Sequence, residues 1–433
     1  MKVLLAVAWY FPDAVGGSEV YVRGLARHLK SAGTDVSIAV PTLDGRAVMI
    51  ADIDGIPVQR FLADNVGGRM DVTRDAPAAW HSLLDTLAPD VVDLHSLTSH
   101  LGVPHLRAAR RRGARTLTTL HLPELTCARG TFMRFGRTPC DGDLAIQPCT
   151  ACRLQVQGVP RLIGRALSLV PRTVGTRAGR LPRIMQRPLV AHLAHDARRA
   201  LVAAVAAESD RMVAVSAWQA DVLRRNGVLH CKIRVCRQGV SAVPDVVPPP
   251  APPGAVLRVG FVGRYDPTKG VHVLVDAFRR LPADLPIQLH LWGIARTPEA
   301  VAYRDLIAQR ALGLPSVTMH PESSPEAIYP RMDVLAVPSI YFETGPLVVL
   351  EAQAWGLPVI GSNIGGIAER VTPGVDGILV PPNDAGALAN VLRGWVREPA
   401  RLRALRPRRR VRTMADAACD TLRTYRELLQ VPA

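Results

Sequence analysis

Two glutamates, Glu343 and Glu351, stand eight residues apart in "YFETGPLVVLEAQAWGLPVI", where most other residues are small or apolar. A carboxylate near a protein core is costly unless it has partners. Eight residues of helix rise about 12 Å, whereas the paired acids of glycoside hydrolases stand about 5 to 9.5 Å apart. The spacing favours two acids that hold opposite ends of one extended ligand. The alternative is two acids satisfied by structural salt bridges.

Two cations form a second group. Arg264 and Lys269 lie in "VGRYDPTKG", between a buried strand pattern and a helix pattern. A helix N-terminus favours phosphate, and Arg and Lys add charge-assisted hydrogen bonds to it. This loop therefore predicts phosphate binding, with an ordinary basic loop as the alternative.

Buried strands that alternate with helices must position these groups. The alternation predicts α/β architecture with parallel sheets covered on both faces. A helix capped by Ser18 is expected to run to about Lys30. The proline-rich run "SAVPDVVPPPAPPG" indicates a linker between two doubly wound, Rossmann-like domains. Because ligands of such sheets bind beyond the strands' carboxyl ends, a central cleft between the domains is the expected site. The predicted parts are residues 1–240 with an insertion at about 123–200, the linker 241–254, a nucleotide-sugar-binding domain 255–410, and a C-terminal helix 411–433 that could pack back on the first domain.

The composition limits the partners and the location. Lys and Arg outnumber Asp and Glu by 53 to 37, so the formal net charge is +16 and an anionic partner is expected. No apolar run reaches the roughly 18 residues of a membrane span. The start, "MKVLLAVAWYF", is typical of a buried first strand rather than a signal peptide. We expect a cytoplasmic protein, with peripheral attachment to the inner face of a membrane left open.

The segment "PSIYFETGPLVVLEAQAWGLPVIGSNIGGIAERVTPGVDGILVPPND" resembles family 4 of the retaining, nucleotide-sugar-dependent glycosyltransferases, which have the GT-B fold. It carries that family's Glu-x7-Glu motif, a G-x-P-V strand, a G-G-x-x-E turn and a G-x-L-V-P-P segment. The resemblance covers most of the second domain and, more loosely, the first. It implies a hexosyltransferase that uses a UDP- or GDP-sugar and acts on a glycan, lipid-linked or small-molecule acceptor.

The resemblance assigns roles to residues of the second domain. Glu351 would hold the ribose hydroxyls of the nucleotide, and Glu343 would lie beside the donor sugar. Arg264 and Lys269 match the family's V-G-R-x-x-x-x-K-G loop and would bind the donor diphosphate. Three glycines are also placed at the donor: Gly263, Gly365 and Gly366. Proline at position 346 has no N–H to offer the sugar, so Leu347 is expected to supply an amide.

Fewer residues carry over in the first domain. Gly16 and Gly17 match the family's glycine pair near the diphosphate. His121 matches the histidine that contacts the donor sugar, although Leu122 follows it where the family commonly has Asp. His95, at another strand end, is the second candidate. Gln238 stands where the family usually has Asn, and it still offers an amide.

The implied reaction needs no cofactor beyond the nucleotide sugar. No D-x-D motif lies in a suitable loop, so protein cations are expected to replace a metal ion. Retention in this family is attributed to front-face attack, with the leaving phosphate accepting the proton. Two other classes stay open: a GT-B epimerase or phosphorylase, and a non-catalytic, basic membrane-binding module.

Four cysteines of the insertion form the pattern C-x12-C-x8-C-x2-C: Cys127, Cys140, Cys149 and Cys152. One C-x2-C gives half of a usual zinc pattern. A structural zinc site, free or redox-active thiols, and disulfides are the three interpretations.

The stretch from Arg153 to His195 contains eight arginines and no acid, interleaved with Leu, Ile and Val. Such a pattern is typical of an element that binds an anionic membrane surface, and the alternative is a solvated basic insertion. Nucleic acid is not expected, because neither this run nor residues 401–413 has aromatic interleaving or a reading motif.

Overall fold

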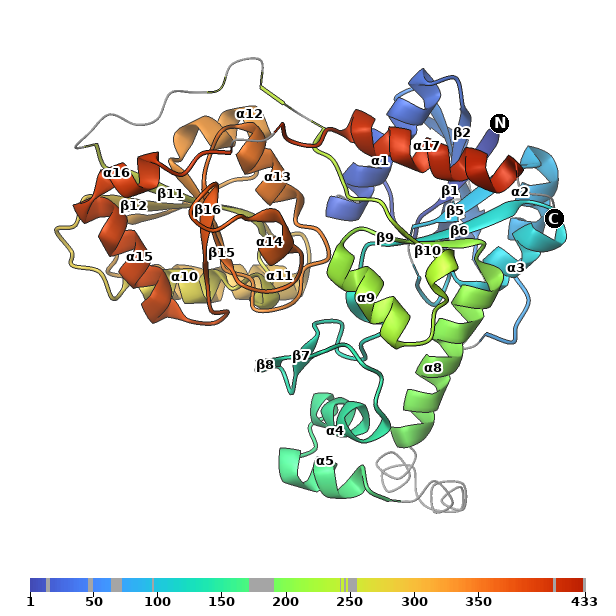
Figure 1. The fold of residues 1–433 in the computed structure, drawn as a ribbon, viewed down its shortest axis with the longest axis horizontal. Coiled ribbons are helices and arrows are strands. Elements are labelled where there is room, and N and C mark those ends of the chain that lie inside the picture. Colours follow the sequence, from blue (N-terminus) through green and yellow to red (C-terminus); the bar gives the residue numbers. More distant parts are fainter. Residues whose placement is uncertain are drawn as a thin grey trace. The chain divides into compact units, whose positions relative to one another are not determined.

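The computed structural model describes residues 1–12, 16–45, 50–63, 72–95, 97–170, 191–241, 243–244, 247, 255–407 and 410–430. The chain divides into two compact units (Figure 1). Unit 1 comprises Met1–Arg237 and Met414–Ala433, and unit 2 comprises Gln238–Thr413. Most of the expected linker, 241–254, lies outside the described residues. Within the described ranges, every helix is too short or too polar to cross a bilayer.

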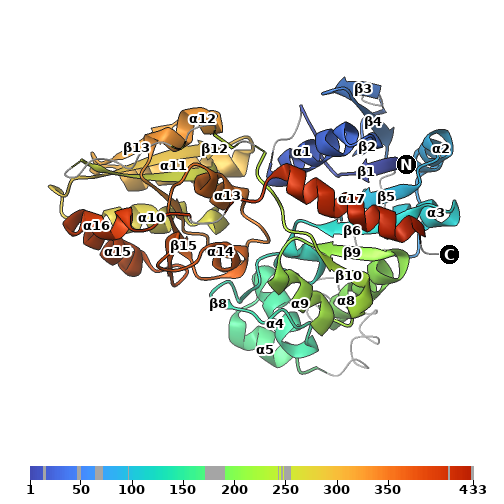
Figure 2. The same cartoon turned by 45° about the horizontal axis from the view of Figure 1, so that its top comes forward.

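Unit 1 is built on an eight-stranded sheet with the order β10-β9-β6-β5-β1-β2-β4-β3 (Figure 2). All of its strands pair in parallel except β3 with β4. β2, β3 and β4 lie on one side of β1, and the later strands lie on the other, so the strand order reverses between β1 and β5. The strands are β1 (Lys2–Ala6), β2 (Asp35–Thr42), β3 (Ile50–Ile53), β4 (Ile56–Leu62), β5 (Val91–Leu94), β6 (Arg115–Leu120), β9 (Arg211–Ala214) and β10 (Ile233–Val235).

Helices cover this sheet, and the last of them comes from the end of the chain. They are α1 (Gly17–Ser31), α2 (Ala78–Leu87), α3 (Val103–Arg111), α8 (Ala191–Glu208), α9 (Ala217–Arg225), the short η4 (His230–Lys232) and α17 (Met414–Gln430). Figures 1 and 2 show α17 beside α1, and the two helices are in contact. The expected cap at Ser18 is wrong: α1 begins at Gly17 because Gly16 is the extended residue whose carbonyl accepts from Val20 N–H.

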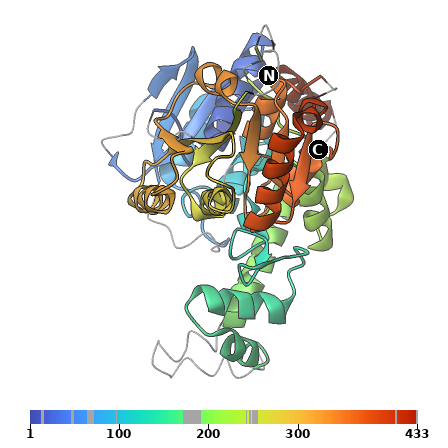
Figure 3. The same cartoon turned by 90° about the vertical axis from the view of Figure 1, so that its left-hand side faces the viewer.

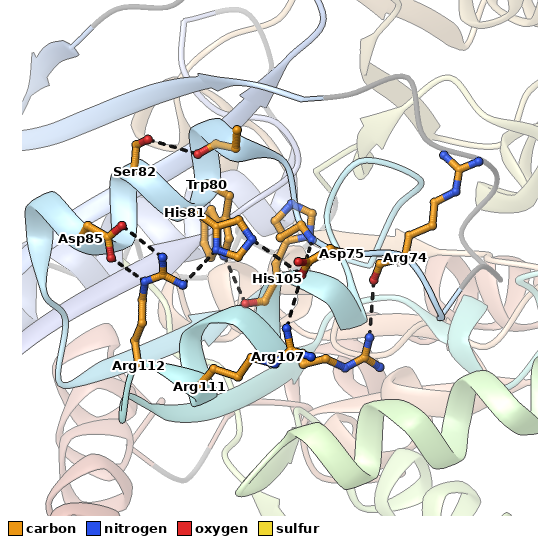
Figure 4. A network of polar contacts seen from close by, with 12 residues as sticks. Arg74, Asp75, Trp80, His81, Ser82, Asp85, His105, Arg107, Arg111 and Arg112 are labelled. Carbon is orange, nitrogen blue, oxygen red and sulfur yellow. Dashed lines mark hydrogen bonds and ion pairs between the residues drawn. The ribbon is translucent and has the colours of Figure 1, made fainter.

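Polar contacts join α2 to α3 over one face of the sheet (Figure 4). The Trp80 indole N–H donates to the carbonyl of His105 at 3.1 Å. Arg112 donates to both carboxylate oxygens of Asp85, at 2.6 and 3.1 Å. Trp80 is fully buried and Phe61 of β4 packs on it. The network therefore holds α2 and α3 together where they pack on β4 and β5.

The insertion lies between β6 and α8. It contains η2 (Pro123–Leu125), a two-stranded hairpin of β7 (Met133–Arg134) and β8 (Thr138–Pro139), α4 (Ile146–Val156) and α5 (Arg161–Leu167). Figures 1 and 3 show α4 and α5 projecting away from the eight-stranded sheet, beside one end of α8. Residues 171–190, which hold five of the eight arginines of the predicted basic stretch, lie outside the described residues.

Unit 2 has a six-stranded parallel sheet with the order β13-β12-β11-β14-β15-β16. Its order reverses between β11 and β14. Separate apolar clusters cover the two faces. The strands are β11 (Leu257–Arg264), β12 (Ile287–Ile294), β13 (Val317–His320), β14 (Val334–Val337), β15 (Val359–Ser362) and β16 (Gly377–Val380). The helices are η5 (Pro267–Lys269), α10 (Val271–Phe278), α11 (Pro298–Ala311), α12 (Pro325–Ile328), η6 (Tyr329–Arg331), α13 (Leu347–Ala354), α14 (Gly365–Arg370), α15 (Ala385–Arg397) and α16 (Pro399–Arg403).

Candidate active site

The two predicted phosphate-binding cations lie at the carboxyl end of β11: Arg264 is its last residue, and Lys269 ends η5 in the loop that follows. Asp266 caps η5 by accepting hydrogen bonds from the amide and the hydroxyl of Thr268, at 2.8 and 2.6 Å. Gly270 then turns the chain into α10 with φ of +71°, a conformation that favours glycine. This short turn fixes Lys269 at the carboxyl end of β11.

The loop after β14 docks on this turn. The Ile340 amide donates to the carbonyl of Thr268 at 2.8 Å. A Cβ on Gly270 would lie 2.0 Å from the carbonyl oxygen of Pro338, so only glycine allows the approach. Because the strand order reverses between β11 and β14, the two loops meet where a doubly wound sheet usually binds its ligand.

This docking brings Lys269 to Glu343. The Lys269 ammonium donates to Glu343 Oε2 at 2.9 Å, and the Ser339 hydroxyl donates to Oε1. The Glu343 side chain is 7% exposed and that of Lys269 is 19% exposed. Burial alone would lower the pKa of Lys269, but the charge of Glu343 and the nearby Tyr341 raise it above its ordinary value. The lysine is therefore a fixed cation whose remaining N–H groups can serve a ligand.

Two glycines support the Glu343 loop from α14. The Gly366 amide donates to the Glu343 carbonyl oxygen at 2.6 Å. A Cβ on Gly365 would lie 2.8 Å from that oxygen, and one on Gly366 would lie 2.6 Å from the Thr344 carbonyl. Both glycines thus have a packing reason to be glycine, which is separate from the donor contact predicted for them.

Arg264 differs from Lys269 in its exposure. Its side chain is 59% exposed at the end of β11, and its guanidinium lies 4.0 Å from the Asp266 carboxylate. Gly263, just before it, has φ of +156°. The structure therefore places one held cation and one exposed cation on the same loop.

Glu351 lies in the second turn of α13 and is partly buried. The Tyr329 hydroxyl of η6 donates to Glu351 Oε2 at 2.5 Å. Burial raises the pKa of Glu351, and the hydrogen bond from Tyr329 partly offsets that effect. The second oxygen, Oε1, can accept from a ligand hydroxyl, as the ribose role requires.

The start of α13 supplies the expected amide position. Pro346 is the residue before the helix and Leu347 is its first residue, and the first N–H groups of a helix have no partner within the helix. Gln238 is buried and accepts from Arg370 at 3.2 Å. A Cβ on Gly345 would lie 2.1 Å from the Gln238 side-chain oxygen, so Gln238 packs against the same loop as Glu343.

In unit 1, His95 and His121 follow the adjacent strands β5 and β6. Their rings stack with centroids 5.2 Å apart, and His95 Nδ1 lies 3.0 Å from His121 Nε2. Both side chains are buried. Burial lowers the pKa of His95 to about 3, and burial together with the neighbouring His95 lowers the pKa of His121 to about 3. Both imidazoles are therefore neutral at physiological pH.

Asp93 of β5 contacts His95 of this pair and is 1% exposed. Tyr425 of α17 and Thr119 of β6 donate to its two oxygens, at 2.7 and 2.8 Å. His95 Nε2 lies 3.5 Å from Asp93 Oδ2. Burial raises the pKa of Asp93, and the two hydroxyls oppose the rise.

The predicted glycine pair lies at the start of α1. Gly16 is the N-terminal cap residue and Gly17 the first residue of the helix. A Cβ on Gly16 would meet the end of the Glu19 side chain at 2.7 Å. The three residues before Gly16 lie outside the described ranges.

All four cysteines of the insertion line one cavity of about 40 Å³. They are free thiols, without a disulfide. In the part of the chain that the structure describes, no three His, Cys, Asp or Glu side chains are already arranged to hold a metal ion.

Sequence reasoning missed four residues that hold the candidate site: Ser339, Tyr329, Asp93 and Tyr425. Asp93 carried a signal, since it is an acid inside the buried strand pattern "VVDL". Ser339 directly follows the strand before Glu343. Nothing in the sequence around Tyr329 or Tyr425 points to its acidic partner.

Comparisons with known proteins bear on the same residues. A profile described as "Glycosyl transferases group 1" matches residues 250–412, and one described as "Glycosyltransferase Family 4" matches residues 15–161. The first contains Lys269, Glu343 and Glu351. The chain belongs to glycosyltransferase family 4.

The relatives of this family 4 chain include D-inositol 3-phosphate glycosyltransferases. That of Rhodococcus opacus is 36% identical over 217 residues, which cover 46% of the chain and 48% of the relative. The chain spans about half the length of the curated relatives that it matches at more than 30% identity. The Arthrobacter sp. protein is 25% identical over 403 residues, which cover 89% of the chain and 83% of the relative.

Solved structures confirm that the family 4 chain has the GT-B fold. Sucrose-phosphate synthase from Thermosynechococcus elongatus superposes with a TM-score of 0.66 at 20% identity, over 99% of both chains. Anabaena HepE, in complex with UDP and glucose, gives a TM-score of 0.60 at 16% identity, over 99% of this chain and 98% of that one. At such identities the likeness concerns the fold alone.

Proposed function

We propose that this chain transfers a hexose from a nucleoside diphosphate sugar to an acceptor, with retention of the anomeric configuration. The observation that carries the proposal is the Lys269–Glu343 pair at the reversal point of the unit 2 sheet, with Arg264 on the same loop. Relatives named as glycosyltransferases, and a structural neighbour solved with UDP and glucose, support a nucleotide-sugar donor.

The proposed division of labour follows from the charges. When the bond between the sugar and the diphosphate breaks, negative charge grows on the leaving oxygen. Lys269 is already held in place, so it stabilises that charge with little reorganisation. Arg264 is exposed and adds a second, bidentate group for phosphate. These cations are proposed to make the reaction independent of a metal ion.

The two glutamates are proposed to act at different ends of the donor. Glu343 is held by Lys269 and Ser339 and lies beside the sugar, where positive charge develops. Glu351, oriented by Tyr329, accepts from the ribose hydroxyls. The Leu347 amide contacts the sugar. In unit 1, Gly16 and Gly17 bring backbone amides to the diphosphate, and His121 contacts the donor sugar as a neutral imidazole.

The test is to incubate the pure chain with UDP-, GDP- and ADP-sugars and to follow hydrolysis and transfer by NMR. We expect one donor to be consumed slowly without acceptor, in the presence of EDTA, and released first as the retained anomer. Loss of turnover in EDTA with rescue by Mg²⁺ would contradict the role of the two cations. Release of an epimerised sugar or a sugar phosphate would identify an epimerase or a phosphorylase instead.

The acceptor is proposed to be lipid-linked, and the reaction to take place at the inner face of a membrane. α5 exposes two apolar side chains, Leu162 at 79% and Ile163 at 53%, next to the exposed Arg161 and Arg165. Apolar side chains inserted among cations are what an anionic bilayer surface binds, and each cation near the leaflet contributes about 1 kcal/mol.

Vesicle flotation tests the proposed membrane binding. Binding should require anionic lipid, weaken with salt, and fall in an L162S/I163S variant. The matched control is Leu312→Ser, which changes a side chain that is 71% exposed on unit 2. A chain that ignores anionic vesicles at low salt would point to a soluble glycan or small-molecule acceptor, and the donor chemistry would be unaffected.

A further inference from the structure

The four cysteines of the insertion come from three different local structures that the fold gathers around one cavity. Cys127 begins a tight turn, in which the Gly130 amide donates to its carbonyl at 3.0 Å. Cys140 directly follows the β7–β8 hairpin, and its amide donates to the Phe132 carbonyl at 2.8 Å. Cys149 and Cys152 lie three residues apart in α4, so both face the same side of the helix. All four line the cavity of about 40 Å³.

From this arrangement we infer that the cavity is a structural Zn²⁺ site with Cys127, Cys140, Cys149 and Cys152 as its four ligands. A turn, a hairpin and a helix, each supplying one or two thiolates, are the parts from which four-cysteine zinc sites are built. The site has no vacant position, so its role is to hold the insertion together rather than to perform catalysis. The inference does not depend on the proposed transferase activity.

Two features around the cavity suit metal-bound thiolates. The Phe135 amide donates to Cys152 Sγ at 3.4 Å, the kind of outer contact that orients a metal ligand. Arg129 and Arg134 line the same cavity. When four thiols bind Zn²⁺, four protons leave to solvent and the complex carries two negative charges, which these arginines would balance.

The segment between Cys140 and Cys149 is tied to unit 1 independently of any metal. The Asn226 side chain accepts from the Leu144 amide at 2.9 Å and donates to the Gly142 carbonyl at 2.9 Å. His195 Nε2 lies 3.0 Å from the Leu144 carbonyl oxygen. One wall of the cavity is therefore anchored on α9 and α8.

Binding requires the sulfurs to converge. Zn–S bonds are about 2.3 Å long, and no three such side chains of the described residues yet form a shell. The turn of Cys127 and the first turns of α4 must close on the anchored wall. Metal binding would therefore supply part of the insertion's folding free energy.

The experiment measures metal and thiols on the whole chain. Protein purified from zinc-supplemented medium without a chelator should contain about one zinc per chain, which a mercurial thiol reagent releases. A C149S/C152S variant should lose the zinc. A C231S/C419S variant, which changes two exposed cysteines outside the cavity, should keep it.

A second readout protects the test against misfolded variants. Cobalt added to the metal-free wild-type chain should give a thiolate-to-metal charge-transfer band, and denatured, metal-stripped protein should show all seven cysteines as thiols. Zinc well below one per chain, with no cobalt band after reduction, would overturn the inference. A thiol count of five or three would overturn it in favour of disulfides.

Discussion

The two units share one architecture but differ in the charge of the polar groups that they hold. In each, polar groups gather where the order of a parallel sheet reverses, beyond the carboxyl ends of neighbouring strands. In unit 2 the groups are ionic and within reach of solvent, with Arg264 59% and Lys269 19% exposed. In unit 1 they are buried, and the two histidines are neutral at physiological pH.

The difference lies in the partners given to each acid. Glu343 receives an ammonium, which leaves a fixed cation directed at a ligand. Asp93 contacts two hydroxyls and the edge of an imidazole, and none of its contacts within the described residues is a Lys or Arg side chain. The fold therefore determines where a polar cluster forms, and the side chains around it determine whether the cluster is charged or neutral.

The largest expected effect comes from removing a cation of unit 2. Lys269→Ala and Arg264→Ala should each lower kcat of donor turnover by about a hundredfold to a thousandfold, because one preorganised group at a developing anion is worth roughly 3 to 4 kcal/mol. Only Lys269→Ala should also destabilise the fold, since it leaves the buried Glu343 without its cation. Steady-state kinetics and urea unfolding check both claims.

Lys269→Arg is the matched control for charge, and Arg304→Ala, on the exposed surface of α11, is the control for an arginine elsewhere in unit 2. A Lys269→Ala chain with near-normal kcat would show that the ammonium serves only to neutralise Glu343. If Lys269→Ala and Arg264→Ala destabilise the fold equally, the proposed difference between the buried Lys269 and the exposed Arg264 is wrong.

A smaller effect should separate the two glutamates. Glu351→Gln should raise KM by roughly ten- to a hundredfold with little change in kcat, because the ribose is contacted alike in the ground and transition states. Glu343→Gln should mainly lower kcat. Tyr329→Phe should repeat the Glu351→Gln pattern more weakly, since it only removes the orienting hydroxyl. The opposite split between KM and kcat would exchange the two roles.

Much of this organisation could be read from the sequence because it is local. The alternation of strands and helices, the "VGRYDPTKG" loop and the Glu-x7-Glu segment each depend on residues close together in the chain. Individual side-chain contacts between distant residues could not be predicted. Asp93 meets Tyr425 from the other end of the chain, and Gly365 and Gly366 pack under Glu343 through backbone atoms that no side-chain pattern reveals. The cysteine spacing left three interpretations open, because spacing alone does not say which thiols face one cavity.

His95 and His121 should make the stability of unit 1 depend on pH. Both have a folded pKa of about 3, below the roughly 6.5 of an unfolded histidine. The native state therefore binds fewer protons between these values, and its stability is lost as the pH falls through that window. The slope is up to about 1.4 kcal/mol per pH unit for each histidine. Asp93, whose pKa is raised, acts in the opposite sense as the pH rises.

Urea unfolding of the wild-type chain and of His95→Gln, measured from pH 7 to pH 5, gives this slope. Unfolding is monitored by the fluorescence of Trp80 in a background in which the other tryptophans are replaced conservatively. The variant should show a shallower dependence. His230→Gln, at an exposed position, should leave it unchanged. Equal slopes in wild type and His95→Gln would mean that folding does not lower the pKa of His95.

A further effect is expected from a single hydroxyl between α17 and the sheet. Tyr425→Phe removes the donor to Asp93 Oδ2 and leaves the ring in its buried place. Because leaving a buried acceptor without its donor costs about 1 to 3 kcal/mol, unit 1 should lose about that much stability. The pKa of Asp93 should rise further, since Tyr425 is the stronger of the two hydroxyls that lower it. Carboxyl NMR of Asp93 measures the pKa, and Tyr303→Phe, which removes a hydroxyl bonded to His272 in unit 2, is the control. If Tyr425→Phe leaves both stability and the Asp93 pKa unchanged, the acid is held by Thr119 and His95 alone, and α17 is attached to unit 1 only by its apolar face.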